Sequence, residues 1–226
     1  MRDNKVIQTV AVVVSISAVA AMMLTARGGL APSLNPEPHR TAGAELARQA
    51  LSLLKPGGQI SVLTRDTATF PNPATDVLLD SFQHELRKAH VSISGKQKLE
   101  VDPLRRLEVP SGDFQGWIHH ANGGDVIVSF LGPPMLSAAQ RLQLGDIKPA
   151  IVAFCPGNWP EQVDFRRLFG DGLLSAAIVT RYGQAAGAIK PISRPTRFEE
   201  NFAVVTKANV DEFVAAAEKS SAPNAP

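Results

Sequence analysis

Asp125–Leu131 reads DVIVSFL, and only Asp125 and Ser129 in this run are polar. A strand that is apolar at almost every position is typical of a parallel sheet covered by helices on both faces. Ala150–Cys155 (AIVAFC) has the same character, as does Ile60–Thr64 (ISVLT), which is followed by a polar loop. These three segments predict the centre of a buried, mostly parallel sheet.

Helical patterns alternate with these strands. Asn72 is a suitable N-cap with Pro73 at the first helical position, and Leu78, Phe82 and Leu86 then form one apolar stripe. Strand–helix alternation indicates right-handed βαβ units, and it predicts a doubly wound, three-layer α/β domain over residues 41–217. The other expected elements are helices over Thr41–Leu54, Ser111–Trp117, Pro160–Phe169 and Val210–Ala217, a helix capped by Ser137 and Gln140, and strands over His90–Val101, Leu174–Thr180 and, at an edge, Phe202–Thr206.

The N-terminal region carries the longest apolar run. Val6–Ala26 holds 21 residues without a charge, enough to cross a hydrocarbon core of about 30 Å as a helix. Residues 1–27 are therefore expected to be a single-pass anchor that contacts the lipid bilayer through residues 6–26. Arg2 and Lys5 precede the run, which favours a cytoplasmic N-terminus and an extracytoplasmic domain. A cleaved signal ending near Ala18-Val19-Ala20, and so a secreted protein, is the alternative.

Composition narrows the possible partners. Residues 28–40 are rich in glycine and proline and are expected to be a linker, and residues 218–226 a disordered tail. The net charge of +2 is contributed by residues 1–27, so the rest of the chain is neutral and no nucleic-acid partner is expected. One cysteine, the adjacent His119 and His120, and the lack of a dinucleotide or P-loop motif predict no metal and no cofactor.

Polar residues follow the predicted strands, where ligands bind in doubly wound sheets. Arg65, Asp66 and Thr67 follow the first strand, Asn158 the fourth and Arg181 the fifth. Parallel strands bring these loops to one edge, so the five residues are expected to meet in one crevice, with both arginines as anion contacts. The predicted function is non-catalytic binding of a small polar ligand or a protein partner. The alternative is that these loops are polar because the backbone turns there, in a purely structural tethered domain.

Cys155 suggests a different function. The segment KPAIVAFCPGN, preceded by DVIVSFLGPP, resembles the DJ-1/PfpI superfamily, and this resemblance implies a cysteine nucleophile at a strand end. The next residue, Pro156, has no N–H to stabilise an oxyanion, and the histidine that often follows the cysteine in that family is missing. Enzyme activity through Cys155 and a buried, inert cysteine are therefore the two interpretations.

Ile60–Leu131 carries a second resemblance. Its strand ISVLT, loop TRDTATFPNP, helix TDVLLDSFQHELRKA, second strand and third strand GGDVIVSFLGPP follow one another in an order that resembles one lobe of type I periplasmic-binding proteins, the substrate-binding proteins of ABC transporters. The resemblance implies a secreted or membrane-tethered protein whose strand-end loops hold a small ligand. Those receptors close two lobes over the ligand, and this chain has residues for one lobe.

Overall fold

The computed structural model describes residues 35–68, 71–100, 109–145, 148–157, 163–181 and 197–221. The expected anchor, residues 1–27, lies outside these ranges, as does most of the segment 28–40. Among the described helices, none has both the length and the apolar character needed to cross a bilayer.

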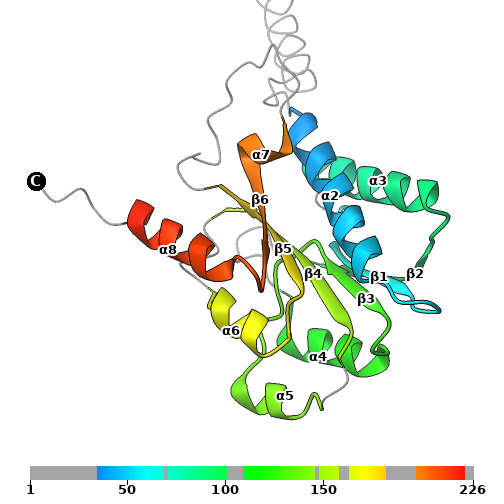
Figure 1. The fold of residues 1–226 in the computed structure, drawn as a ribbon. Helices are drawn as coiled ribbons and strands as arrows, with labels where there is room; N and C mark the ends of the chain where they lie inside the picture. Colours follow the sequence, from blue (N-terminus) through cyan, green and yellow to red (C-terminus); the bar gives the residue numbers. More distant parts are fainter. Residues whose placement is uncertain are drawn as a thin grey trace, which may run out of the picture. The chain divides into compact units, whose positions relative to one another are not determined.

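The centre of the domain is a six-stranded sheet (Figure 1). Its strands lie in the order β2-β1-β3-β4-β5-β6, in which the first five are parallel and β6 is antiparallel to β5. This arrangement confirms the mostly parallel α/β sheet that the sequence predicts. The strands are β1 (Ile60–Arg65), β2 (Ile93–Leu99), β3 (Val126–Ser129), β4 (Ala150–Cys155), β5 (Ala176–Thr180) and β6 (Phe202–Thr206).

Helices cover both faces of the sheet (Figure 1). One face packs against α2 and α3, and the other against α4, α6 and α8. A four-residue helix, α7, immediately precedes β6 and was not predicted. The helices are α2 (Glu37–Leu53), α3 (Pro73–Lys88), α4 (Ser111–His120), α5 (Ala138–Leu142), α6 (Phe165–Gly170), α7 (Phe198–Asn201) and α8 (Val210–Ser221).

The core is divided into two clusters by the sheet. Successive strand residues point to opposite faces, so Val62 and Val128 pack on the α2/α3 side while Leu63 and Ile127 pack on the other. All four side chains are at most 1% exposed. Burial on both faces explains why β1, β3 and β4 are apolar without alternation, whereas the edge strand β2 is largely exposed.

Four helix ends differ by several residues from the expected ones. α6 begins at Phe165 and not at Pro160, because the Asp164 side chain caps it by accepting the Arg167 N–H at 3.0 Å. α2 begins at Glu37, inside the segment expected to be a linker, because Asn35 Oδ1 accepts the Glu37 N–H at 3.1 Å and Glu37 pairs with Arg40 at 2.7 Å. α4 continues beyond Trp117 to His120, and α8 continues to Ser221 within the expected tail. These extensions are short-range effects at helix ends, where sequence patterns are least informative.

Glycine allows α2 and α3 to pack closely. Gly43 lies in the buried stripe of α2, and a Cβ atom built there would overlap the backbone carbonyl oxygen of Leu78 in α3. Ala42, Ala47 and Ala50 complete a small-residue surface on the same helix. The close contact between α2 and α3 lets both helices pack on the same face of the sheet, so α2 is part of the domain.

Candidate functional site

Polar groups are buried at the edge of the sheet where the parallel strands end. Thr64 and Ser129 are the buried polar residues of the described part of the chain, at 1% and 0% exposure, and they lie at the ends of the neighbouring strands β1 and β3. The Ser129 hydroxyl accepts the Leu131 N–H at 3.3 Å. The Thr64 hydroxyl has no partner among the described residues.

Unpaired buried atoms are concentrated at this same edge. Within the described ranges, three buried side-chain atoms lack a hydrogen-bond partner: Thr64 Oγ1, Arg65 Nε and Asn201 Nδ2. Thr64 and Arg65 end β1, and Asn201 lies beside the end of β5, because its carbonyl accepts the Arg181 N–H at 2.9 Å. Leaving a buried polar group unpaired costs about 1–3 kcal/mol, so such groups are rare unless another molecule satisfies them.

The loop after β1 is held in place by its neighbours. The Asp66 N–H donates to the Leu99 carbonyl of β2 at 2.8 Å, and the Asp66 carboxylate accepts the Ala68 N–H at 3.1 Å. Lys98 Nζ lies 4.0 Å from the same carboxylate. The Thr67 hydroxyl donates to Asp76 in the first turn of α3 at 3.1 Å. Arg65, Asp66 and Thr67 are thus brought together at one corner of the sheet.

Arg181 lies elsewhere along the edge. It follows β5, and β3 and β4 separate β5 from β1, which corresponds to about 14 Å at the usual strand spacing. Its Nε donates to the Phe202 carbonyl at 3.1 Å, and its side chain lines a hollow of about 460 Å³ beside β6. Arg65, Asp66 and Thr67 do not line this hollow. Asn158 lies outside the described residues.

The environment of Cys155 does not suit a nucleophile. The side chain is fully buried, and desolvation raises the pKa of the Cys155 thiol far above its usual range, so the thiol stays protonated. Pro156 has no N–H, and the next amide, that of Gly157, already donates to the Thr180 hydroxyl at 3.0 Å. No backbone donor of these two residues remains for an oxyanion.

The histidines of α4 do not assemble a metal site. His119 and His120 are both exposed, and the ring Nδ1 of His120 lies 2.6 Å from the Gly116 carbonyl of the same helix. In the part of the chain that the structure describes, no three His, Cys, Asp or Glu side chains are grouped to hold a metal ion.

No protein-family model matches the sequence, and no curated protein matches it. Solved structures do match the fold. An arabinose-binding protein from Geobacillus stearothermophilus aligns over 77% of this chain and 63% of its own, at 15% identity and a TM-score of 0.50. An ABC transporter solute-binding protein from Agrobacterium vitis, bound with alpha-D-tagatopyranose, aligns over 79% of this chain and 60% of its own, at 17% identity and a TM-score of 0.50.

The fold is that of type I periplasmic-binding proteins. The resemblance expected over Ile60–Leu131 is therefore confirmed and extends to more than three quarters of the chain. A putative LacI transcriptional regulator from Bacteroides fragilis shares the periplasmic-binding fold at 11% identity and a TM-score of 0.50, over 77% of this chain and 61% of its own. At these identities the likeness concerns the fold alone. The chain spans less than two thirds of the length of each of these structures.

The sequence did not lead us to two features: the buried hydroxyls at the ends of β1 and β3, and the hollow beside β6. Thr64 and Ser129 are hydroxyl residues at the ends of otherwise apolar strands, and that contrast in ISVLT and DVIVSFL is the signal that identifies them. The hollow beside β6 has no comparable sequence signal, because its walls come from α2, α7, β6 and α8.

Proposed function

We propose that this chain is a non-catalytic domain that binds a small polar ligand at the carboxyl ends of its parallel strands. The observation that carries this proposal is the set of unpaired buried atoms at that edge, above all Thr64 Oγ1. A ligand would supply the hydrogen bonds that these atoms lack. The periplasmic-binding fold supports the same conclusion, because proteins with this fold include the arabinose-binding and tagatose-bound structures described above.

The contacts proposed for this ligand lie at the β1 corner. Arg65 is the donor for an acidic or hydroxyl oxygen, Asp66 the acceptor for a ligand hydroxyl, and Thr67 a further hydroxyl contact, with Asn158 contributing from the loop after β4. Removing the Arg65 guanidinium is expected to weaken binding by about 1.5–3 kcal/mol, the usual worth of a charged hydrogen bond. Arg181, which follows β5, lines a different hollow.

A pair of threonine substitutions tests the site. Thr64→Val replaces an unpaired buried hydroxyl with a methyl group of the same shape, so the free energy of unfolding without ligand is expected to rise by about 1 kcal/mol or more. Thr180→Val is the matched control, because that hydroxyl accepts the Gly157 N–H, and its loss is expected to destabilise the protein by about 1 kcal/mol. Chemical denaturation of the full chain in detergent measures both values.

Ligand binding is measured on the same proteins. Calorimetry with D-arabinose, D-tagatose and small carboxylates is expected to find at least one ligand whose affinity falls about tenfold or more in Thr64→Val and Arg65→Gln and is unchanged in Arg87→Gln, an exposed arginine of α3. Destabilisation by Thr64→Val, equal to that of Thr180→Val, would show that the Thr64 hydroxyl is satisfied and would remove the main support for the proposal.

We further propose that residues 6–26 anchor the domain on the extracytoplasmic side of a membrane. The support is the uncharged run itself and the two basic residues before it. Alkaline phosphatase fused after Pro226, which is active only outside the cytoplasm, is expected to be active, and the fusion is expected to remain in the membrane fraction. A reporter in the same position that works only in the cytoplasm contradicts this orientation, and release of the mature domain indicates signal cleavage instead.

A further inference from the structure

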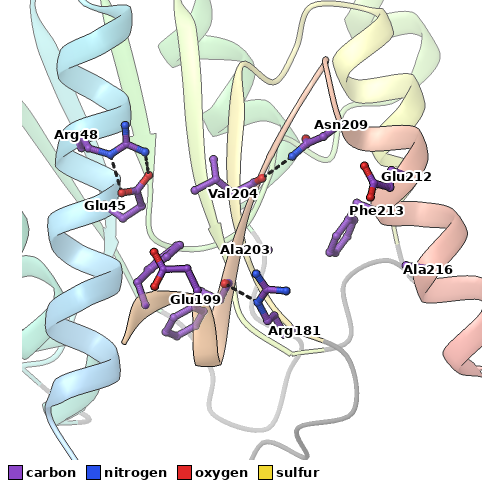
Figure 2. Close-up of a pocket in the computed structure, with 12 residues that line it drawn as sticks. Glu45, Arg48, Arg181, Glu199, Ala203, Val204, Asn209, Glu212, Phe213 and Ala216 are labelled. Atoms are coloured by element: carbon purple, nitrogen blue, oxygen red, sulfur yellow. Dashed lines mark hydrogen bonds and ion pairs between the residues drawn. The ribbon is translucent and has the colours of Figure 1, made fainter. Parts of the chain in front are cut away.

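The hollow beside β6 is separate from the strand-end site. It has a volume of about 460 Å³ and lies along β6, the last strand of the sheet (Figure 2). Glu199 lies on its α2 side, and Glu212 and Phe213 of α8 on the other side (Figure 2). Arg181 is beside Ala203, whose side chain packs in the same cluster as Phe213.

The backbone at this edge is already hydrogen-bonded to the chain itself. In the antiparallel register with β5, Phe202, Val204 and Thr206 direct their N–H and C=O groups outward. The Phe202 carbonyl accepts Arg181 Nε, and its N–H bonds to Phe198. Asn209 accepts the Thr206 N–H at 2.7 Å, donates to the Val204 carbonyl at 2.9 Å, and bonds the Thr206 carbonyl through its own N–H at 3.2 Å.

Among the described residues, one outward group of these three has no hydrogen-bond partner: the Val204 N–H. An extended peptide would need a row of free donors and acceptors to add to the sheet, so it does not fit this edge. A single free backbone donor suits a compact molecule that accepts one hydrogen bond better than it suits a peptide.

The charged side chains of the hollow differ in the ion pairs and hydrogen bonds that they form with the described residues. Arg48 and Glu45 of α2 bind each other through two hydrogen bonds. Arg181, Glu199 and Glu212 form no ion pair with any described residue, and the two terminal nitrogens of Arg181 make no hydrogen bond within that part of the chain. Arg181 and the Val204 N–H are both donors, whereas Glu212 is an acceptor on the same side of β6.

We propose that this hollow binds a small zwitterion with an apolar body, such as a free amino acid. Its carboxylate is held by Arg181 and the Val204 N–H, because a guanidinium and an amide both donate to carboxylate oxygens. Its ammonium group is held by Glu212. Its apolar part lies against Phe213 and Ala203, with the Phe213 ring fixed edge-on against Phe165 at 6.3 Å between centroids.

Three probes of matched shape test the proposal on the full chain in detergent. L-leucine carries both charges, 3-methylbutylamine lacks the carboxylate, and 4-methylpentanoate lacks the ammonium group. L-leucine is expected to bind about tenfold or more tightly than either single-charge probe, and to shift the NMR resonance of the Val204 amide. Equal affinities for the three probes, no binding of L-leucine at millimolar concentration, or an unshifted Val204 amide each overturn the proposal.

Three substitutions then locate the charges. Arg181→Gln and Glu212→Gln are each expected to lower the affinity for L-leucine about tenfold, because each removes one charged contact from an exposed side chain that the core does not need. Glu200→Gln is the control, since Glu200 is an exposed carboxylate next to Glu199 that does not line the hollow. Equal effects of all three variants show a general charge effect and contradict a site. Thr64→Val, at the strand-end site, is expected to leave the affinity for L-leucine unchanged. The outcome is therefore independent of the function proposed above.

Discussion

Replacing Gly43 with alanine is expected to lower the free energy of unfolding by about 3 kcal/mol, among the largest effects of any single methyl group added to this domain. The new Cβ would overlap the Leu78 carbonyl oxygen, which belongs to the backbone of α3 and cannot rotate away. α2 and α3 would have to separate, which loosens the packing of Leu46 and Phe82, both fully buried in the same cluster.

Urea denaturation followed by tryptophan fluorescence measures this effect. Gly116→Ala is the matched control, because a Cβ at Gly116 in the interior of α4 meets no atom within 4 Å. That change is expected to raise the free energy of unfolding by about 0.5–1 kcal/mol, the usual difference between alanine and glycine in a helix. If both substitutions change the free energy of unfolding in the same direction, α2 and α3 do not pack through Gly43 as described.

Cys155 in the folded protein is expected to react with iodoacetamide at least about 10³-fold more slowly than in the unfolded protein. The thiol is fully buried and its pKa is raised by desolvation, so both access and the reactive thiolate are missing until the chain unfolds. A domain of ordinary stability, about 5 kcal/mol or more, is unfolded less than about one part in 10³ of the time. Reaction is therefore limited by unfolding.

An exposed thiol calibrates the measurement. Ser52→Cys in a Cys155→Ala background places a thiol on the exposed surface of α2, and it is expected to react at the rate of a free cysteine. Fast alkylation of Cys155 itself near pH 7 would instead indicate a thiolate stabilised in the folded state. That result would favour the cysteine-dependent enzyme and oppose a purely binding function.

The elements of this fold were largely predictable because their signals are local. The uninterrupted apolar runs of β3 and β4 follow from burial on both faces. The start of α3 follows from Asn72, whose side chain accepts the Thr75 N–H at 3.1 Å, and from Pro73 at the first turn. Ser137 and Gln140 likewise form the predicted capping box. Each of these depends on residues within a few positions of one another.

The candidate site was predictable only in part. Because parallel strands end at one edge, the position of Arg65, Asp66 and Thr67 follows from the sequence once β1 is identified. The partnerless state of Thr64 does not, because it depends on which groups of other elements come within hydrogen-bond distance. The antiparallel direction of β6 and the short helix α7 before it also lacked a local signal, and they form the hollow that Arg181 lines.

The sequence by itself determined the apolar strands, the helix caps and the mostly parallel α/β class, since hydrophobic periodicity and capping act over a few residues. The tertiary structure alone decided the strand order β2-β1-β3-β4-β5-β6, and with it the two strands that separate Arg65 from Arg181. It also decided that Cys155 is sealed in the core, although the residue stands at a strand end where a reactive thiol was conceivable. Strand order and burial arise from contacts between residues far apart in the chain, which no local pattern records.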